Sequence, residues 1–488
     1  MADPKTFTDD PKLEFAETRS DASDIDYEAE KKLLWKMDWI ILPTIAPLYV
    51  FSFLDRVNIG NARLYGLEED LGLSSMQFSI AISLFFVTYV CVEIPSNLVI
   101  KRIGPSRWIA FITFVWGIVA TLTGLVQNFG GLVACRLVLG IFEGGFVPGI
   151  IVYLTLFYTK KEMALRIAFF MVSAPTAGAF GGLLAYGIGH MDGILGHRGW
   201  RWIFILEGIP TCILAIIVFF IMADGPETAK FLSPDEKALL RLRQKRCTGW
   251  TESSEVLHKE DVYRALLDWK LWMFCVSGFG SATTLYGYAT FLPTIIHGID
   301  PSYSTAMVQV MTIPCYCAGG IVSLFVAYAS DRLQFRGGIA AGMGLISCTG
   351  YVILLSTDDS SAGYAGCFLI PLGIYTMSGL SLTWLTTNNP RYGKRVTAVA
   401  MGTMSVNCGG IMMSYIYPKD EGPRYHRGHA ITLSLTLVSI CAIAFLSWYF
   451  ARANRRRAAG KEDHKIAGMT DEQIEELGDR NPRFVYTA

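Results

Sequence analysis

The sequence predicts an all-α membrane protein with twelve transmembrane helices in two pseudo-symmetric six-helix bundles. Composition is the first observation behind this prediction, because 52% of the 488 residues are hydrophobic and only 17% are charged. The second is a series of apolar runs about 20 residues long, which is the length that crosses the bilayer hydrocarbon. The third is that landmarks of the first half recur in the second. Together they exclude an ordinary soluble protein.

The predicted spans follow these apolar runs along the chain. An even number of spans places both termini on one side of the membrane, and the loops on that side carry more Lys and Arg than the opposite loops. The positive-inside rule therefore predicts cytoplasmic termini, and we expect the plasma membrane as the location. The spans are 39–58, 76–100, 107–127, 131–157, 165–189, 202–222, 270–296, 304–329, 338–356, 364–386, 396–417 and 429–451.

Polar stretches at both ends and in the middle divide the chain into five predicted parts. The middle stretch contains Ser233, Pro234 and Glu236, the pattern of a capped helix start. The parts are a disordered cytoplasmic N-terminal tail at 1–36, an N-terminal six-helix bundle at 37–222, a cytoplasmic linker at 223–268, a C-terminal six-helix bundle at 269–452 and a cytoplasmic C-terminal tail at 453–488.

Two pairs of basic turns indicate that the six-span unit is duplicated. Arg102 and Arg332 are separated by almost the same number of residues as Arg166 and Arg395. Repeats of this kind place a solute site between the halves, near the middle of the bilayer.

Charged residues inside the apolar spans are the strongest functional signal. Arg136 and Glu143 lie seven residues apart in the fourth span, and two helical turns put them on one face. Asp55 and Arg56 end the first span. A charge at the bilayer centre costs at least ~2.5 kcal/mol, so these side chains must face protein or water.

The chemistry of these residue types suits transport of an anion with a proton. Arginine binds a carboxylate through two parallel hydrogen bonds, which predicts substrate binding by Arg56 and Arg136. A buried acid next to arginine can change its protonation state, which predicts proton coupling by Asp55 and Glu143. The alternative is a static ion pair, Arg136 with Glu143 or Asp55 with Arg56, that only holds the helices in register.

Several motifs in order give the chain a specific resemblance. Over about residues 35–455 the chain resembles the major facilitator superfamily and, within it, the anion:cation symporter family, in the fungal branch with allantoate, nicotinate, pantothenate and biotin permeases. The resemblance implies a rocking two-bundle carrier with a central cavity. The motifs are FLDRVNIGNARLYGLEEDLGL, FFVTYVCVEIPSNLVIKRIGPSRW, RLVLGIFEGGFVPG, GWRWIFILEGIPT, ASDRLQFRG and TTNNPRYGKRVTA.

The resemblance also implies roles for further residues. Tyr89 and Asn407 match positions that line the cavity, although a plain helix–helix hydrogen bond is the alternative for each. Tyr286 and Trp384 are candidates for stacking an aromatic acid, with ordinary core packing as the alternative. We expect Glu93 and Glu207 to be structural, capping helix ends or pairing with loop arginines. The predicted cytoplasmic latch between the bundles consists of Arg102, Arg166, Asp331, Arg332 and Arg395.

The predicted function is proton-coupled import of a small organic anion, such as nicotinate, pantothenate or allantoate, by alternating access. The alternative is a proton-antiport exporter, but SAPTAGAFGG in the fifth span lacks the Gly-Pro-x-x-Gly-Gly arrangement typical of such exporters. No catalytic motif is present, so we expect no enzymatic activity, cofactor or metal. The expected partners are the anion, protons and the lipid bilayer, with no nucleic acid, and we expect a monomer.

Overall fold

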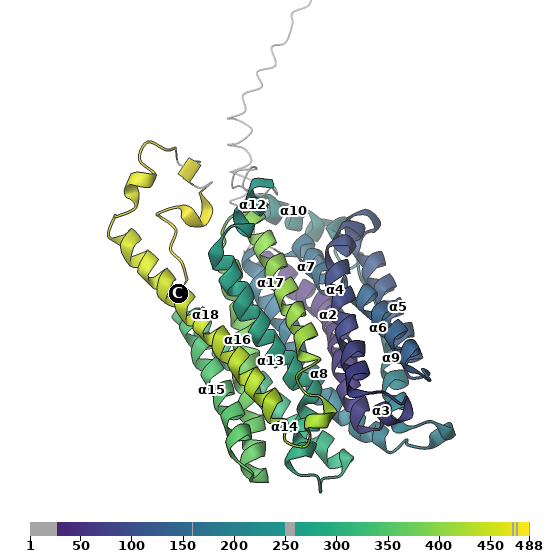
Figure 1. The fold of residues 1–488 in the computed structure, drawn as a ribbon. Coiled ribbons are helices and arrows are strands. Elements are labelled where there is room, and N and C mark those ends of the chain that lie inside the picture. The colour runs from purple at the N-terminus through teal and green to yellow at the C-terminus, as the bar shows by residue number, and fades with distance from the viewer. Residues whose placement is uncertain (1–26, 159, 249–258, 471–472, 475–476, 488) are drawn as a thin grey trace, which may run out of the picture.

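The computed structural model describes residues 27–158, 160–248, 259–470, 473–474 and 477–487, and the regular structure in these ranges is helical (Figure 1). The first helix, α2, spans Tyr27–Leu64 and so begins inside the predicted N-terminal tail. Its extension is held by Lys36, which donates to Glu236 at 2.8 Å. The rest of the predicted disordered tail lies outside the described residues.

Long helices run side by side along the molecule and correspond to the predicted spans. Those of the first half are α2, α4 (Ser75–Ile103), α5 (Pro105–Thr123), α6 (Phe129–Glu143) continued by α7 (Phe146–Phe157), α8 (Lys160–Gly189) and α9 (Gly199–Ile221). Those of the second half are α13 (Trp269–Ile299), α14 (Thr305–Leu333), α15 (Arg336–Ser356), α16 (Ser360–Thr387), α17 (Tyr392–Met413) and α18 (His426–Ala458).

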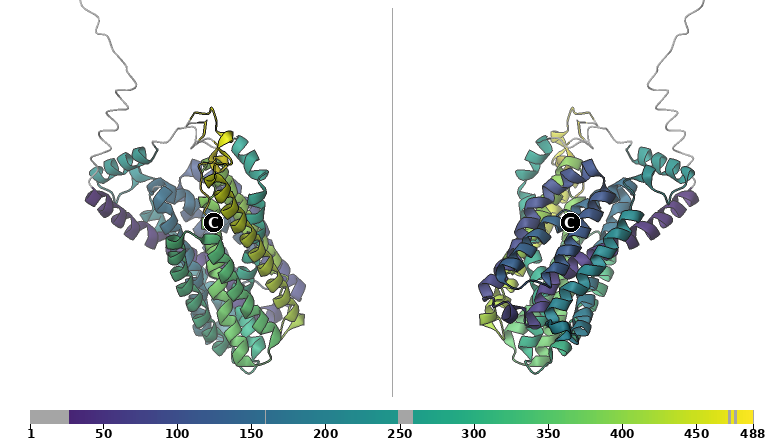
Figure 2. Two further views of the ribbon diagram at one scale, coloured as in Figure 1. Left: turned by 90° about the vertical axis from the view of Figure 1, so that its left-hand side faces the viewer. Right: turned by 90° about the vertical axis from the view of Figure 1, so that its right-hand side faces the viewer.

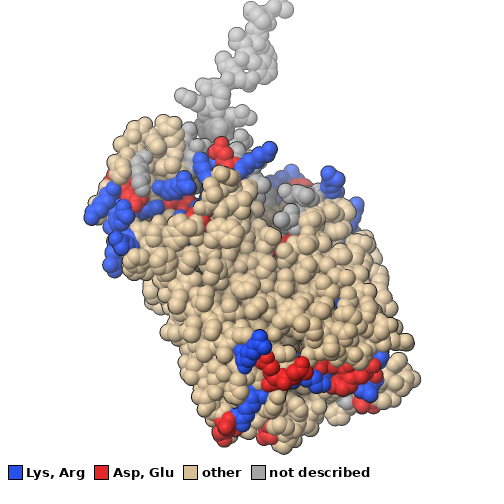
Figure 3. Space-filling model, viewed as in Figure 1, with Lys and Arg blue, Asp and Glu red and all other residues tan. Residues whose placement is uncertain are grey.

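Most of these helices are apolar enough to cross a bilayer. Among the described residues, 10 helical segments meet that requirement by length and composition. Figure 3 shows the same property on one face of the molecule, where charged residues gather at the two ends and leave an uncharged band between them. We call these two charged ends of the molecule the termini face and the opposite face. The termini face carries the start of α2, the linker and the C-terminal tail, and the opposite face carries α3 (Leu67–Asp70) and the short helix Lys419–Glu421.

The packing of the two halves is repeated. In the first half α2 packs on α8, α4 on α6 and α5 on α9. The equivalent helices of the second half pack in the same way, since α13 contacts α17, α14 contacts α16 and α15 contacts α18. The halves meet through α8 with α14, α4 with α17 and α2 with α13.

On the opposite face the halves are tied together by polar contacts. Arg63 of α2 donates to the backbone carbonyl of Tyr417 at 3.1 Å. Lys419 pairs with Glu69 and, at 3.6 Å, with Glu68. The backbones are also close, because a Cβ added to Gly60 would lie 1.9 Å from the Thr290 carbonyl oxygen. This end of the molecule is therefore closed between the halves.

On the termini face each half makes polar contacts of its own. The first half binds linker helix α10 (Pro234–Thr248), because Arg243 pairs with Glu30 at 2.7 Å and with Glu162 at 2.5 Å. The second half binds linker helix α12 (Lys259–Leu266) through Arg391 and Asp261 at 2.7 Å. Between described residues we find no ion pair that joins the halves here, and Figure 2 shows the start of α2 and α10 standing apart from α18.

The predicted capped start of the linker helix is confirmed. The Glu236 backbone N–H donates to the Ser233 hydroxyl at 3.2 Å, and the Ser233 backbone N–H donates to the Glu236 carboxylate at 2.8 Å. Together these bonds satisfy two N–H groups that helix geometry leaves free, and this fixes where α10 begins.

The described part of the C-terminal tail folds back onto the second half. Asp479, 3% exposed, accepts from Lys270 at 2.5 Å and from Lys394 at 2.8 Å. Tyr486 stacks on Phe450 with ring centroids 4.5 Å apart. Burial alone would raise the pKa of the Asp479 carboxyl, but the charges of the two lysines outweigh burial and lower that pKa to about 2.

We expect Asp479→Asn to destabilise the docked tail at neutral pH. A carboxyl whose pKa is lowered by folding adds stability above its unfolded pKa and loses it as the pH falls through the folded value, here between about 4 and 2, with an integrated effect of roughly 2 kcal/mol. Limited proteolysis of the tail and thermal unfolding in detergent measure the change. The exposed Asp463→Asn is the control, and equal protease resistance in both variants would contradict the expectation.

Candidate functional site

Glu143 lies at a break in the fourth span, between α6 and α7, where α6 approaches α4 closely. Glycines permit this approach, because a Cβ at Gly140 would lie 2.0 Å from the Thr88 hydroxyl and one at Gly144 would lie 2.7 Å from the Tyr89 carbonyl oxygen. The side chain of Glu143 is fully buried. It is therefore carried into the interior of the first half.

The partner of Glu143 is Arg56 of α2. Arg56 Nε donates to Glu143 Oε1 at 2.8 Å, and Nη2 of the same guanidinium lies 2.6 Å from that oxygen. Ser52, one turn earlier on α2, donates its hydroxyl to the same oxygen at 2.6 Å. Neither alternative ion pair considered from the sequence is the one observed, because the pair joins two helices through Arg56 and Glu143.

Arg136 is buried and has unfilled hydrogen-bonding capacity. Its side chain is 3% exposed, and within the described residues its Nε and Nη2 groups find no acceptor. The guanidinium lies 5.7 Å from the centroid of the Phe204 ring and interacts electrostatically with Asp55 and Glu143. An unpaired polar group in an apolar interior costs on the order of 1–3 kcal/mol, and more when charged. Arg136 therefore keeps two hydrogen-bond donors without an acceptor among the described residues.

Asp55 belongs to a polar layer that sequence reasoning found only in part. It accepts a hydrogen bond from the Trp116 indole, and one turn further along α2 the Asn58 amide donates to Glu207 of α9. Glu207 thus pairs with an asparagine inside the first half rather than with a loop arginine. Trp116 and Asn58 carry no charge, so a search for charged residues in apolar spans does not find them.

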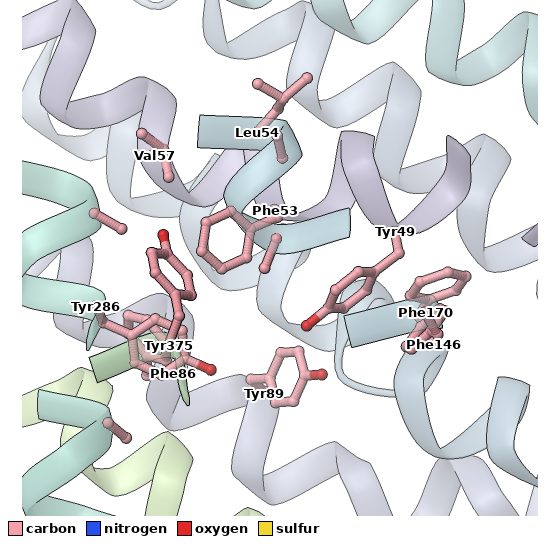
Figure 4. Packing of buried hydrophobic residues seen from close by; sticks show 14 of the residues in the cluster. Tyr49, Phe53, Leu54, Val57, Phe86, Tyr89, Phe146, Phe170, Tyr286 and Tyr375 are labelled. Atoms are coloured by element: carbon pink, nitrogen blue, oxygen red, sulfur yellow. The ribbon is translucent and has the colours of Figure 1, made fainter. Parts of the chain in front are cut away.

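Aromatic side chains from both halves surround Arg56. Its guanidinium lies 4.9 Å from the Tyr89 ring centroid and 5.7 Å from that of Phe85, both on α4. Tyr286 of α13 packs against Phe86 with centroids 5.2 Å apart. Figure 4 shows the rings of Tyr89, Phe86 and Tyr286, and the Tyr49 hydroxyl turned toward that of Tyr89. The structure therefore brings the predicted Tyr89 and Tyr286 to one place, next to the arginine.

Two other predicted substrate residues lie in different surroundings. Asn407 of α17 is 6% exposed and interacts with the Glu93 carboxylate. Because Arg56 also interacts with Glu93, Asn407 lies in the neighbourhood of Arg56. Trp384 is fully buried between Phe274 and Phe450, with centroids at 4.9 and 5.6 Å, and donates to the Thr487 carbonyl at 2.7 Å. Trp384 belongs to the core that receives the C-terminal tail, so we leave it out of the candidate site.

Three arginines of the predicted latch lie in different surroundings. Arg166 pairs with Asp38 at 2.5 Å inside the first half. Arg102 is exposed, and Arg332 donates to Tyr328 at 3.0 Å on its own helix. The Asp331 side chain lies outside the described residues, and Arg395 is partly buried.

We expect Arg63→Ala to loosen the opposite face. The bond from the buried Arg63 to Tyr417 involves a charged donor, which contributes on the order of 1.5 kcal/mol or more, whereas the exposed pair of Lys419 and Glu69 contributes little. Backbone hydrogen exchange in 417–421 should therefore become about tenfold faster. The exposed Arg198→Ala is the matched control, and equal exchange in both variants would contradict the expectation.

The comparisons with known proteins agree with this geometry. The model of the Major Facilitator Superfamily matches residues 45–416. An uncharacterized transporter of Schizosaccharomyces pombe is 37% identical, with 93% of this chain and 90% of the relative covered. The major facilitator-type transporter hxnP of Emericella nidulans is 31% identical, with 95% and 94% covered.

Solved structures show the same fold. A bacterial homolog of the human lysosomal transporter Spinster, inward-facing and unoccupied, matches with a TM-score of 0.64 at 16% identity, covering 84% of this chain and 96% of the other. A D-xylose-proton symporter matches with a TM-score of 0.63 at 13% identity, covering 85% and 97%. These likenesses concern the fold alone.

The helix packing and the buried charged layer define a multi-pass membrane transporter of the secondary class. The chain belongs to the Major Facilitator Superfamily. The predicted fold class is confirmed.

Proposed function

We propose that this transporter belongs to the anion:cation symporter branch and imports a small organic anion together with protons. The buried, unfilled Arg136 is the observation that carries this proposal. Arg56 is paired with Glu143 at 2.6 Å, and release of that pair would make a second guanidinium available to a carboxylate. A carboxylate or carboxylate-bearing vitamin, such as nicotinate, pantothenate or allantoate, fits that chemistry.

Charge balance supports proton coupling through Asp55 and Glu143. The two buried arginines already interact with these two acids, so the group holds no surplus positive charge. An arriving anion would add an unbalanced negative charge in a low-dielectric interior unless an acid takes up a proton. Protonation of Glu143 would free Arg56 to bind the substrate, and protonation of Asp55 would do the same for Arg136.

The polar and aromatic neighbours of the arginines complete the proposed substrate site. Tyr89 and Tyr286 flank Arg56 from the two halves, and Asn407 lies nearby on α17. A ligand held between side chains of both halves would favour states in which they close around it. The aromatic rings would favour a planar or aromatic acid.

The positive-inside rule supports cytoplasmic termini, and we propose the plasma membrane as the location and a monomer as the working unit. The closed opposite face and the separate halves at the termini face then describe an inward-facing state. In the outward-facing state we propose that Arg102, Arg166, Asp331, Arg332 and Arg395 form the cytoplasmic latch.

Uptake into vesicles tests the proposal. Radiolabelled nicotinate, pantothenate, allantoate and biotin are offered with and without an inward proton gradient. Accumulation of one acid that requires the gradient is the expected result. Gradient-driven extrusion of a compound would support a proton-antiport exporter instead, and uptake unaffected by the gradient would overturn the coupling.

A further inference from the structure

Glu93 of α4 links the two halves of the molecule through its contact with α17. It is 7% exposed, and its Oε1 accepts a hydrogen bond from the Thr403 hydroxyl at 2.9 Å. The Asn407 side chain also interacts electrostatically with the carboxylate. Among the described residues, the other oxygen, Oε2, has no hydrogen-bond partner. Glu93 was expected to cap a helix end or pair with a loop arginine, and the structure gives it partners on α17 instead.

The charged groups around Glu93 come from several helices. Arg56 of α2, Tyr89 of α4 and Tyr286 of α13 interact with it electrostatically. From α6, Glu143 reaches the same surroundings through Arg56, while Thr403 and Asn407 of α17 are uncharged. Within the described part of the chain, no Lys or Arg forms an ion pair with Glu93, which shares the field of Arg56 with Glu143.

The strength of the hydrogen bond between Thr403 and Glu93 depends on whether the Glu93 carboxyl is ionised. A hydrogen bond to an ionised carboxylate is roughly twice as strong as one between neutral groups. Thr403 donates to Glu93, so an ionised Glu93 binds α17 more strongly than a protonated one would. Because α4 belongs to the first half and α17 to the second, a change in this bond changes the energy of moving one half against the other.

We propose that Glu93 is a positioning residue that couples occupation of the substrate site to movement of the two halves. Ionised, it accepts the hydrogen bond from Thr403, attracts the Asn407 amide and ties α17 to α4. When Glu93 binds a proton, or when an anion takes Asn407, the tie weakens and α17 is released. The role of Asn407 in this scheme rests on the proposed function, whereas the tie between the helices rests on the contacts alone.

Spin-label distance measurements test the tie without needing a known substrate. Labels at Ile103 of α4 and Leu333 of α14, which are 44% and 67% exposed on the termini face, report the separation of the halves. They are attached through bio-orthogonal side chains, because the chain has 11 cysteines of its own. In lipid nanodiscs the wild-type distance distribution should shift as the pH is lowered, because protonation of Glu93 weakens the tie.

The variants separate proton binding from simple packing. Glu93→Gln keeps an acceptor for Thr403 but cannot bind a proton, so it should abolish the pH-dependent shift. Glu93→Asp should restore part of it. Thr403→Val should move the distribution at every pH and keep a shift, because the acid is still present. A Glu93→Gln protein that follows the wild-type shift, a Thr403→Val protein indistinguishable from Glu93→Gln, or a wild type without any shift would overturn the proposal.

An uptake arm distinguishes failure of this inference from failure of the proposed function. The same variants are tested in vesicles with radiolabelled nicotinate, pantothenate, allantoate and biotin. If no acid accumulates in the wild type while Glu93→Gln abolishes the distance shift, the anion proposal fails and the tie stands. If an acid accumulates and the distance shift survives in Glu93→Gln, the anion proposal stands and the role of Glu93 is refuted.

Discussion

Replacing Glu143 with glutamine is expected to abolish gradient-driven accumulation while leaving anion exchange in part. Glutamine is nearly the same size and can accept hydrogen bonds from Ser52 and Arg56, which lie at 2.6 and 2.8 Å in the wild type. Glutamine cannot bind or release a proton, so the release of Arg56 from position 143 would no longer depend on pH. Uptake against a gradient, compared with counterflow exchange at equal pH on both sides, measures the two activities separately.

Two further variants make the Glu143 result specific. Glu143→Asp keeps an acid and should retain some proton dependence, and the exposed Glu227→Gln removes an acid far from the site and should behave like the wild type. Proton dependence equal to that of the wild type in Glu143→Gln would assign the coupling to another acid. A protein that loses exchange as well as accumulation would indicate that the amide disrupts the site itself.

The fold could be predicted almost completely from the sequence, because the apolar runs and their repetition follow directly from the bilayer. The main differences arise where polar residues pack on protein. α2 continues back to Tyr27 because its first turns bind the linker helix, and the tail around Asp479 docks because two lysines neutralise the acid. A hydropathy profile shows that such segments are polar, but it does not show which residues they pack against.

The candidate site could be predicted as a set of residues but not as a set of contacts. Charges in apolar spans identified Arg56, Arg136, Glu143 and Asp55. Pairing depends on the relative rotation and depth of neighbouring helices, which periodicity along a single helix does not determine. For that reason the sequence pointed to Arg136 as a partner of Glu143, whereas close packing of α6 and α4 and the position of α2 place Arg56 there.

Replacing Arg136 with alanine is expected to weaken the apparent affinity for the anion at least tenfold. A charge-assisted contact contributes on the order of 1.5 kcal/mol or more, which corresponds to about a tenfold change in the dissociation constant. Substrate-dependent uptake rates across a range of anion concentrations measure it. Arg136→Lys keeps the charge without the planar fork and should give an intermediate affinity, while the exposed Arg107→Ala should leave it unchanged.

Stability separates a ligand-binding Arg136 from a structural one. Its Nε and Nη2 groups lack acceptors among the described residues, so Arg136→Ala breaks few contacts and removes a buried, incompletely paired charge. We therefore expect a smaller loss of thermal stability in detergent than Arg56→Ala causes, together with the loss of affinity. Arg56→Ala should behave differently, because it leaves Glu143 buried without its cation. A less stable Arg136→Ala protein with unchanged affinity would assign Arg136 to the framework and remove it from the anion site.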